Sequence, residues 1–159
     1  MAPTIDQSDR WLTIDSPFGA DQLVLTAFDG EEALSELFSY RLELMSPDDA
    51  LDADKILGKK VTFTVFRADA DPRIFNGVVK SFHAGPKRTR GFRTYHAEVV
   101  PWTWFLSRTS DCKIFQEKSV KTIIEEVFGE YGMTDYELKL SATYKEHVYR
   151  VQYRETDLD

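Results

Sequence analysis

Cysteine is almost absent from this sequence of 159 residues, since Cys112 stands alone. No internal disulfide can form, which predicts folding in a reducing compartment. Long apolar runs are also missing, because the longest uncharged stretch near the aromatic residues, 99–107, is too short to cross a bilayer. The first residues lack both a basic start and an apolar run, so we expect synthesis in the cytoplasm without a signal peptide.

Basic residues are also fewer than acidic ones. Lys and Arg total 20 against 27 Asp and Glu, which gives a formal net charge of −7. This balance argues against general nucleic-acid binding, which requires a basic surface to neutralise phosphates. What the chain does contain is apolar material, with 42% hydrophobic and 13% aromatic residues, enough for a sizeable folded core.

The first hundred residues show the patterns of short β-strands with no long helical period. Strands are predicted at 22–28, 38–44, 61–65, 73–83 and 92–100. Asp29–Gly30 predicts a turn after the first of them, and Asn76–Gly77 predicts either a tight turn or a bulge within one long strand. A polar linker, 46–54, precedes a short helical turn at 53–57. Repeated short strands favour a β-barrel or sandwich.

The pattern changes near Pro101. Apolar residues recur at helical spacing from Val120 to Tyr131, with Ser119 as the N-cap and Gly132 as the residue that ends the helix. Strands are predicted again at 136–140 and 148–153. The last strand has nothing after it to cover its edge, so either it pairs within the domain or the chain was cut from a longer protein.

Four residues depart from simple alternation in the predicted strands: Val24, Phe28, Phe66 and Phe75. Two explanations are open. Both faces of their strands are buried, one of them against a neighbouring subunit, or the strands have an irregular register.

Residue types that carry chemistry are scattered. The three histidines are His83, His96 and His147, and only the first two could face each other across a hairpin; a metal site there is disfavoured against solvated or hydrogen-bonded histidines. The acidic stretch lacks the pattern of a calcium loop, so helix capping in a solvated linker is favoured for Asp48, Asp49, Asp52 and Asp54.

Catalytic residues are not indicated either. Cys112 has no neighbouring base and is interpreted as a small buried hydrophobic residue. Glu155, Asp157 and Asp159 are interpreted as exposed terminal acids rather than an acid–base pair. No nucleophile elbow, dinucleotide fingerprint or phosphate loop occurs. We expect no enzyme activity, no cofactor and no metal site.

Two groups of residues are candidates for contact with a partner. The first is a basic cluster on the hairpin loop, which is either a solvated loop or a site for an acidic partner, made of Lys80, Lys87, Arg88, Arg90 and Arg93. The second is the aromatic segment 101–106, whose Trp102 and Trp104 pack in a core or junction or else anchor a subunit contact.

Six segments in a fixed order resemble the N-terminal region of VgrG, the spike protein family of type VI secretion. They span nearly the whole chain from Leu12 and are 28–44 (FDGEEALSELFSYRLEL), 75–79 (FNGVV), 101–106 (PWTWFL), 111–116 (DCKIFQ), the helix from Ser119, and 151–157 (VQYRETD). The resemblance implies a mainly β fold with some α, in which 1–106 forms a β-barrel domain like the phage tail hub. Residues 107–159 begin a second α+β unit with one helix at about 119–131.

The resemblance further implies a homotrimeric ring that sits on the hexameric Hcp tube. A needle tipped by a PAAR protein follows the ring, and sheath contraction exports the assembly. In the family the chain continues beyond the last motif, so this chain is expected to be truncated, with effectors and needle supplied by the missing C-terminal part. Alternatives are a phage tail hub or baseplate protein, or a free-standing carbohydrate- or peptide-binding barrel with Trp11, Trp102 and Trp104 as stacking residues.

Overall fold

The computed structural model describes residues 5–88 and 91–159. The chain forms two compact units, Met1–Trp102 and Thr103–Asp159, which are described separately below. The sequence prediction placed the boundary after Leu106, within the short 3₁₀ helix Trp102–Arg108 that contains both positions. No helix of the described residues is long and apolar enough to cross a membrane.

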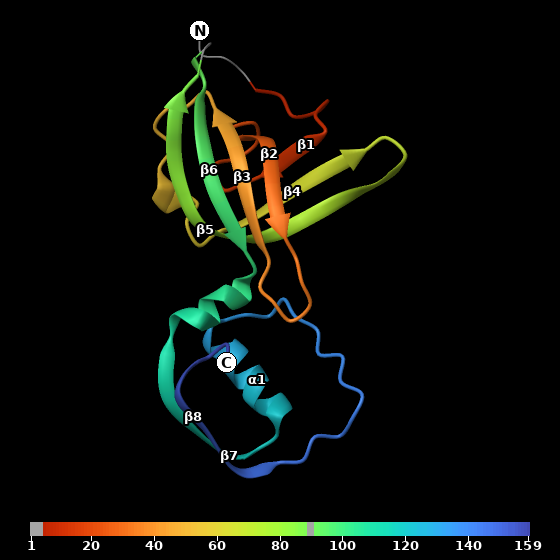
Figure 1. The fold of residues 1–159 in the computed structure, drawn as a ribbon, viewed down its shortest axis with the longest axis vertical. Helices are drawn as coiled ribbons and strands as arrows, with labels where there is room; N and C mark the ends of the chain where they lie inside the picture. The colour runs from red at the N-terminus through yellow and green to blue at the C-terminus, as the bar shows by residue number, and fades with distance from the viewer. Residues whose placement is uncertain (1–4, 89–90) are drawn as a thin grey trace. The chain divides into compact units, whose positions relative to one another are not determined.

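The first unit is a curled antiparallel sheet of six strands (Figure 1). Its strands in chain order are β1 (Leu12–Asp15), β2 (Val24–Glu31), β3 (Ser39–Ser46), β4 (Lys60–Arg67), β5 (Ala70–Lys87) and β6 (Arg93–Val100). The spatial order is β1-β4-β5-β6-β3-β2, so the sheet curls into a half-barrel with β1 and β2 at its edges. The predicted mainly β, barrel-like fold is confirmed.

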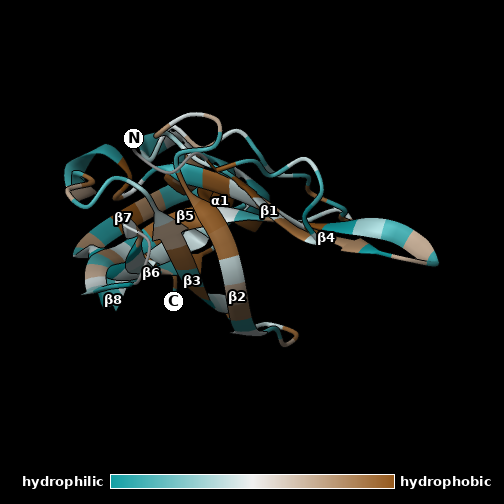
Figure 2. Ribbon diagram, turned by 90° about the horizontal axis from the view of Figure 1, so that it is seen from above, coloured by the Kyte–Doolittle hydropathy of each residue, from teal (hydrophilic) through white to brown (hydrophobic). Residues whose placement is uncertain are grey.

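Alternation along β3 gives this strand one buried face. On β3 the side chains of Tyr40, Leu42 and Leu44 are buried, while those between them are exposed or half-buried. Figure 2 shows hydrophobic stretches along several strands, including the first half of β2. Phe63 and Phe75 stack at 4.8 Å between ring centroids in the centre of the core. Burial of such rings, together with that of the aliphatic side chains around them, stabilises this unit.

The predicted turn at Asp29–Gly30 is wrong. β2 continues through both residues to Glu31, and the connection to β3 follows at 32–38. Gly30 is the register partner of Tyr40, and a Cβ added to Gly30 would lie 2.2 Å from Cδ1 of that ring. The glycine therefore makes room for a buried aromatic ring rather than a turn.

At Asn76–Gly77 the alternative of one long strand is confirmed, because β5 runs without interruption from Ala70 to Lys87. Its register shifts against β6 lie further along, at 79–81 and 84–87, and one against β4 lies near its start, at 70–73. A register shift at 25–27 in β2 leaves both Val24 and Leu25 buried. Irregular register thus explains why Val24 departs from simple alternation. Phe66 also departs from it, but its side chain is 42% exposed. The predicted helical turn after the linker is the 3₁₀ helix Ala53–Lys55.

The second unit combines a strand pair with one helix. β7 (Ser110–Lys118) pairs antiparallel with β8 (His147–Thr156), and α1 (Val120–Glu130) lies between them in sequence. The helix prediction is confirmed, since the Ser119 hydroxyl accepts from the Thr122 N–H at 3.2 Å and Gly132 has φ +65°. The final predicted strand finds its partner within the unit.

One predicted strand of this unit is absent from the described structure, and one observed strand was not predicted. Residues 136–140 form no strand; Tyr136 packs instead on Phe128 of α1, with 4.8 Å between the ring centroids. β7 was not predicted, because its charged residues interrupt the apolar alternation. Pairing with β8 supplies the backbone hydrogen bonds of this strand, although its sequence pattern does not predict a strand.

Candidate functional site

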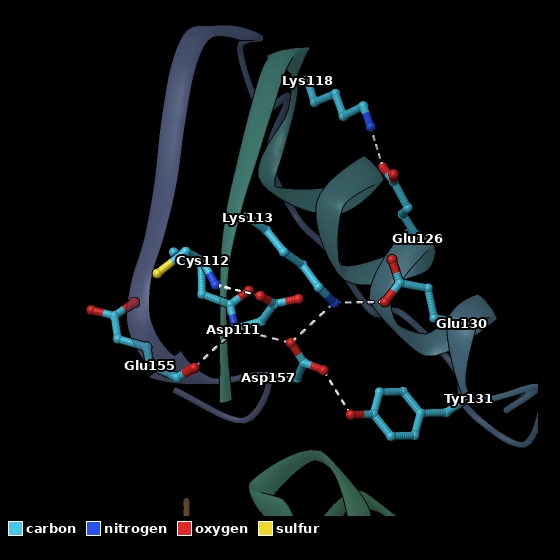
Figure 3. A network of polar contacts seen from close by, with 10 residues as sticks. Asp111, Cys112, Lys113, Lys118, Glu126, Glu130, Tyr131, Glu155 and Asp157 are labelled. Carbon is cyan, nitrogen blue, oxygen red and sulfur yellow. Dashed lines mark hydrogen bonds and ion pairs between the residues drawn. The ribbon is translucent and has the colours of Figure 1, made fainter. Parts of the chain in front are cut away.

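A polar network in the second unit centres on Asp157, just after β8 (Figure 3). The side chain of Asp157 is only 1% exposed. One carboxylate oxygen accepts from the Tyr131 hydroxyl at 2.6 Å, and the other accepts from Gln152 Nε2 at 2.9 Å and Lys113 Nζ at 3.2 Å. The prediction of an exposed terminal acid is therefore wrong for Asp157.

Opposing effects set the charge state of the network. Burial alone raises the pKa of Asp157, but the hydrogen bonds from Tyr131, Gln152 and Lys113 outweigh it and hold the pKa below the usual value. Lys113 also pairs with Glu130 of α1 at 2.6 Å, and that contact, followed by Asp157, raises the pKa of Lys113. Both groups are thus held in their charged forms near neutral pH.

This geometry joins three elements of the second unit. Both oxygens of Asp157 are occupied by donors from β7, β8 and the end of α1. A carboxylate whose pKa is lowered is a poor general base. The segment Tyr153–Asp157 is the part of the sequence that pointed to this site. The network could not be predicted from it, because the hydrogen-bond partners of Asp157 lie up to 44 residues away.

The other terminal acids and the cysteine are placed differently. Glu155 is exposed, and Asp159 accepts hydrogen bonds from the backbone and hydroxyl of Thr156, both at 2.8 Å. Cys112 is also exposed, which corrects its interpretation as a buried residue. It lies on β7 beside Tyr153 of β8, at the register shift that follows Asp111.

The basic cluster is largely engaged within the first unit. Lys87 forms an ion pair with Asp49. Arg93 donates to the carbonyl of Asp49 at 2.7 Å and to that of Gly85 at 3.1 Å. These contacts hold the β5–β6 hairpin against the linker that follows β3.

Two further residues of the basic cluster, Lys80 and Arg88, also contact other side chains of the first unit. Lys80 pairs with Glu98 at 2.8 Å, and the Arg88 Nε donates to the Thr94 hydroxyl at 3.1 Å. Arg90, also predicted as a contact residue, lies outside the described residues. The cluster is thus partly neutralised by the chain itself.

The predicted contact tryptophans lie on the 3₁₀ helix Trp102–Arg108 and are half-buried. Within the second unit, Trp104 packs on Phe105 with 5.5 Å between the ring centroids, and the Arg108 guanidinium lies 5.3 Å from the centre of its indole. Trp11, by contrast, is 62% exposed.

The structure places the candidate metal ligands as follows. His83 and His96 face each other across the hairpin, as the sequence allowed, with 5.4 Å between the ring centroids. In the described parts of the chain no three His, Cys, Asp or Glu side chains converge on one ion position. Helix capping is confirmed for Asp52, which accepts from the Asp54 N–H at the start of the 3₁₀ helix. Asp48 instead accepts from the Ala50 N–H within the linker, and Asp49 pairs with Lys87.

The first unit is a curled half-barrel, and the second combines one helix with a two-stranded ribbon tied by a polar network. A family model described as phage tail baseplate hub (GPD) matches residues 31–159. The chain belongs to this family.

The relatives are spike proteins of type VI secretion. VgrG1b and VgrG1c of Pseudomonas aeruginosa are each 41% identical over 153 residues, which is 96% of this chain but only 20% and 21% of those proteins. VgrG3 of Vibrio cholerae is 31% identical over 147 residues, 87% of this chain and 14% of its own length. The resemblance to VgrG is confirmed, and the chain spans about a fifth of the length of the first two relatives.

A solved structure shares the fold. It is the Escherichia coli c3393 protein, described as a component of the type VI secretion system with similarity to the T4 tail proteins gp27 and gp5. The TM-score is 0.75 at 22% identity, and the match covers 92% of this chain and 40% of that one. The hub-like fold therefore extends over both units of the chain.

Proposed function

We propose that this chain is a structural component of the spike or hub of a type VI secretion or related contractile injection machine. The observation that carries the proposal is the hub-family match over 31–159, together with the half-barrel and the two-stranded unit that follows it. The relatives named as type VI spike proteins support the same role. The function is mechanical, and we propose no catalytic activity for this chain.

The finer proposal concerns assembly. As part of a longer protein, the chain forms a homotrimeric hub that sits on an Hcp-like hexameric tube. The needle, a PAAR-type tip and effectors attach through sequence beyond this chain, since relatives are about five times longer. The protein is made in the cytoplasm and exported by the type VI machine itself. The domain division at 1–106 and 107–159 stays part of this proposal.

We further propose that partner contacts involve Lys87, Arg88, Arg90, Arg93, Trp102 and Trp104. Arg88 supports this interpretation because it is exposed and its guanidinium donates to a neutral hydroxyl, that of Thr94. Exposed charges at the rim of an interface change association rates more than affinity. Trp104 supports it because a half-buried indole offers apolar surface for a partner.

The test is the solution mass of this chain and of the full-length gene product, by light scattering on a sizing column, with and without Hcp hexamer. We expect the full-length protein to be a trimer that elutes together with Hcp. Arg88→Ala and Trp104→Ala should weaken that association, whereas Lys145→Ala, an exposed residue elsewhere, should not. A monomeric full-length protein that ignores Hcp would overturn the spike proposal.

Two alternatives are distinguished by further observations. A phage tail hub or baseplate protein shares the same fold, and a tail-tube protein from a neighbouring phage gene would replace Hcp as its partner. A free-standing ligand-binding barrel is favoured only by the exposed indole of Trp11. Saturable quenching of tryptophan fluorescence by an oligosaccharide, abolished in Trp11→Ala, would support that alternative.

A further inference from the structure

The apolar stripe of α1 is only partly covered within the second unit. Val127 is buried, but Val120 is 42% exposed. The other members of the stripe are half-buried: Ile123, Ile124 and Phe128. An amphipathic helix of a folded domain normally packs this stripe against the core, so part of the helix surface is left without a neighbour.

A hollow of about 510 Å³ lies beside this stripe and is called the α1 hollow below. Its apolar lining comes from the stripe itself, from Phe115 of β7 and from Leu106 of the 3₁₀ helix. Leu158 and Asp159, the last residues of the chain, also line it. Voids in packed protein interiors are rarely larger than a water molecule, so the α1 hollow is more than a packing defect.

The relatives are much longer than this chain. The family match runs to residue 159, and the chain covers about a fifth of VgrG1b. The match to the solved hub-like structure covers only 40% of that protein. A segment that directly follows Asp159 starts at the border of the α1 hollow and needs no linker to reach it. Direct linkage gives it an effective concentration of about millimolar or more, which favours it over a separate molecule of similar affinity.

We propose that the α1 hollow binds the segment that directly follows Asp159 in the longer protein, through an apolar face of that segment. The inference rests on the proposed function in one respect, namely that this chain is part of a longer spike or hub protein. The contact buries Val120, Ile123 and Ile124 and completes the small core of the second unit. It forms within one subunit and does not depend on trimer assembly.

The test compares backbone hydrogen exchange, followed by mass spectrometry, in this chain and in the full-length gene product. We expect peptides that cover α1 to exchange at least about tenfold more slowly in the full-length protein, because its helix is then buried on the apolar side. Peptides from β3, in the core of the first unit, are the reference and should exchange equally in both proteins. Equal exchange of α1 in the two proteins overturns the proposal.

Two valine variants separate filling of the α1 hollow from other contacts. Val120 and Val148 are both exposed residues of the second unit, but only Val120 lines the hollow. Serine has nearly the helix propensity of valine, so Val120→Ser removes apolar surface with little effect on the helix itself. In the full-length protein Val120→Ser should remove most of the additional protection of α1, and Val148→Ser should retain it. Equal effects of the two substitutions contradict the proposal.

Other occupants give different results. Protection of α1 that rises with the concentration of this chain alone would assign the hollow to a second copy. Protection that is lost when the full-length protein is diluted to monomers would assign it to a neighbouring subunit. Either result overturns the proposal.

Light scattering on the same full-length samples keeps this inference apart from the proposed function. A full-length monomer with a protected α1 supports the contact and overturns the trimeric hub. A trimer whose α1 exchanges as fast as in this chain supports the hub and overturns the contact.

Discussion

At the scale of single residues, Asp157 shows how much a buried carboxylate depends on its donors. Its oxygens receive hydrogen bonds from a tyrosine, a glutamine and a lysine that come from three different elements. A buried charge without such partners would be strongly unfavourable. The network therefore holds the end of β8 against β7 and the end of α1.

Replacing Asp157 by Asn should destabilise the second unit by about 2 kcal/mol, because Lys113 loses its buried counter-charge and Tyr131 a charged acceptor. The pKa of Asp157 is lowered in the folded chain. Its stabilisation is consequently complete above about pH 4 and is lost as the pH falls through the lower folded value. Urea unfolding at several pH values measures both effects.

Glu146→Gln is the matched control, since Glu146 is an exposed acid of the same unit. It should leave the unfolding midpoint unchanged. If Asp157→Asn were as stable as the unsubstituted chain at pH 7, or retained the same acid sensitivity, the network would not carry the stability assigned to it.

At the scale of elements, β5 shows how close packing of backbones selects glycine. Gly77 lies in the middle of this strand, and a Cβ there would come within 2.6 Å of the Val99 side chain and 2.7 Å of the Val100 carbonyl oxygen. The second neighbour is backbone and cannot turn away. The residue that the sequence suggested as a turn is thus a place where two strands approach each other closely.

Gly77→Ala should lower the free energy of unfolding of the first unit by about 1–3 kcal/mol, the range for overpacking a filled site. Gly129→Ala is the comparison, because Gly129 lies in α1 with no atom within 4 Å of an added Cβ. That change should be neutral or stabilise the helix by up to about 1 kcal/mol. Chemical denaturation followed by far-ultraviolet circular dichroism measures both, and a Gly77→Ala variant of unchanged stability would contradict the close approach.

At the scale of the whole molecule, the two units differ in how much core they bury. The sheet of the first unit surrounds a continuous cluster that includes Phe63, Leu44 and Val99, each with no exposed surface. The second unit buries few apolar side chains, chiefly Leu106, Phe115 and Val127. A two-stranded ribbon is marginally stable without further packing.

We therefore expect the amides of β3 and β6 to exchange with deuterium at least about tenfold more slowly than those of β7 and β8. Hydrogen exchange followed by mass spectrometry of this chain measures the difference. Peptides from the loop 136–146, which forms no strand, provide the fast-exchanging reference. Equal protection of the two units would mean that the second unit is stabilised by contacts beyond its own small core.

The sequence by itself determined the features that depend on near neighbours. Alternation along β3, the Ser119 cap and the periodicity of α1 are local patterns, and the ordered motifs identified the hub family without any structure. The burial of Asp157, the exposure of Cys112 and the role of Gly30 were decided only by the tertiary structure. Each depends on residues brought together from distant positions or from a partner strand. Such contacts cannot be predicted from the spacing of residues along the chain.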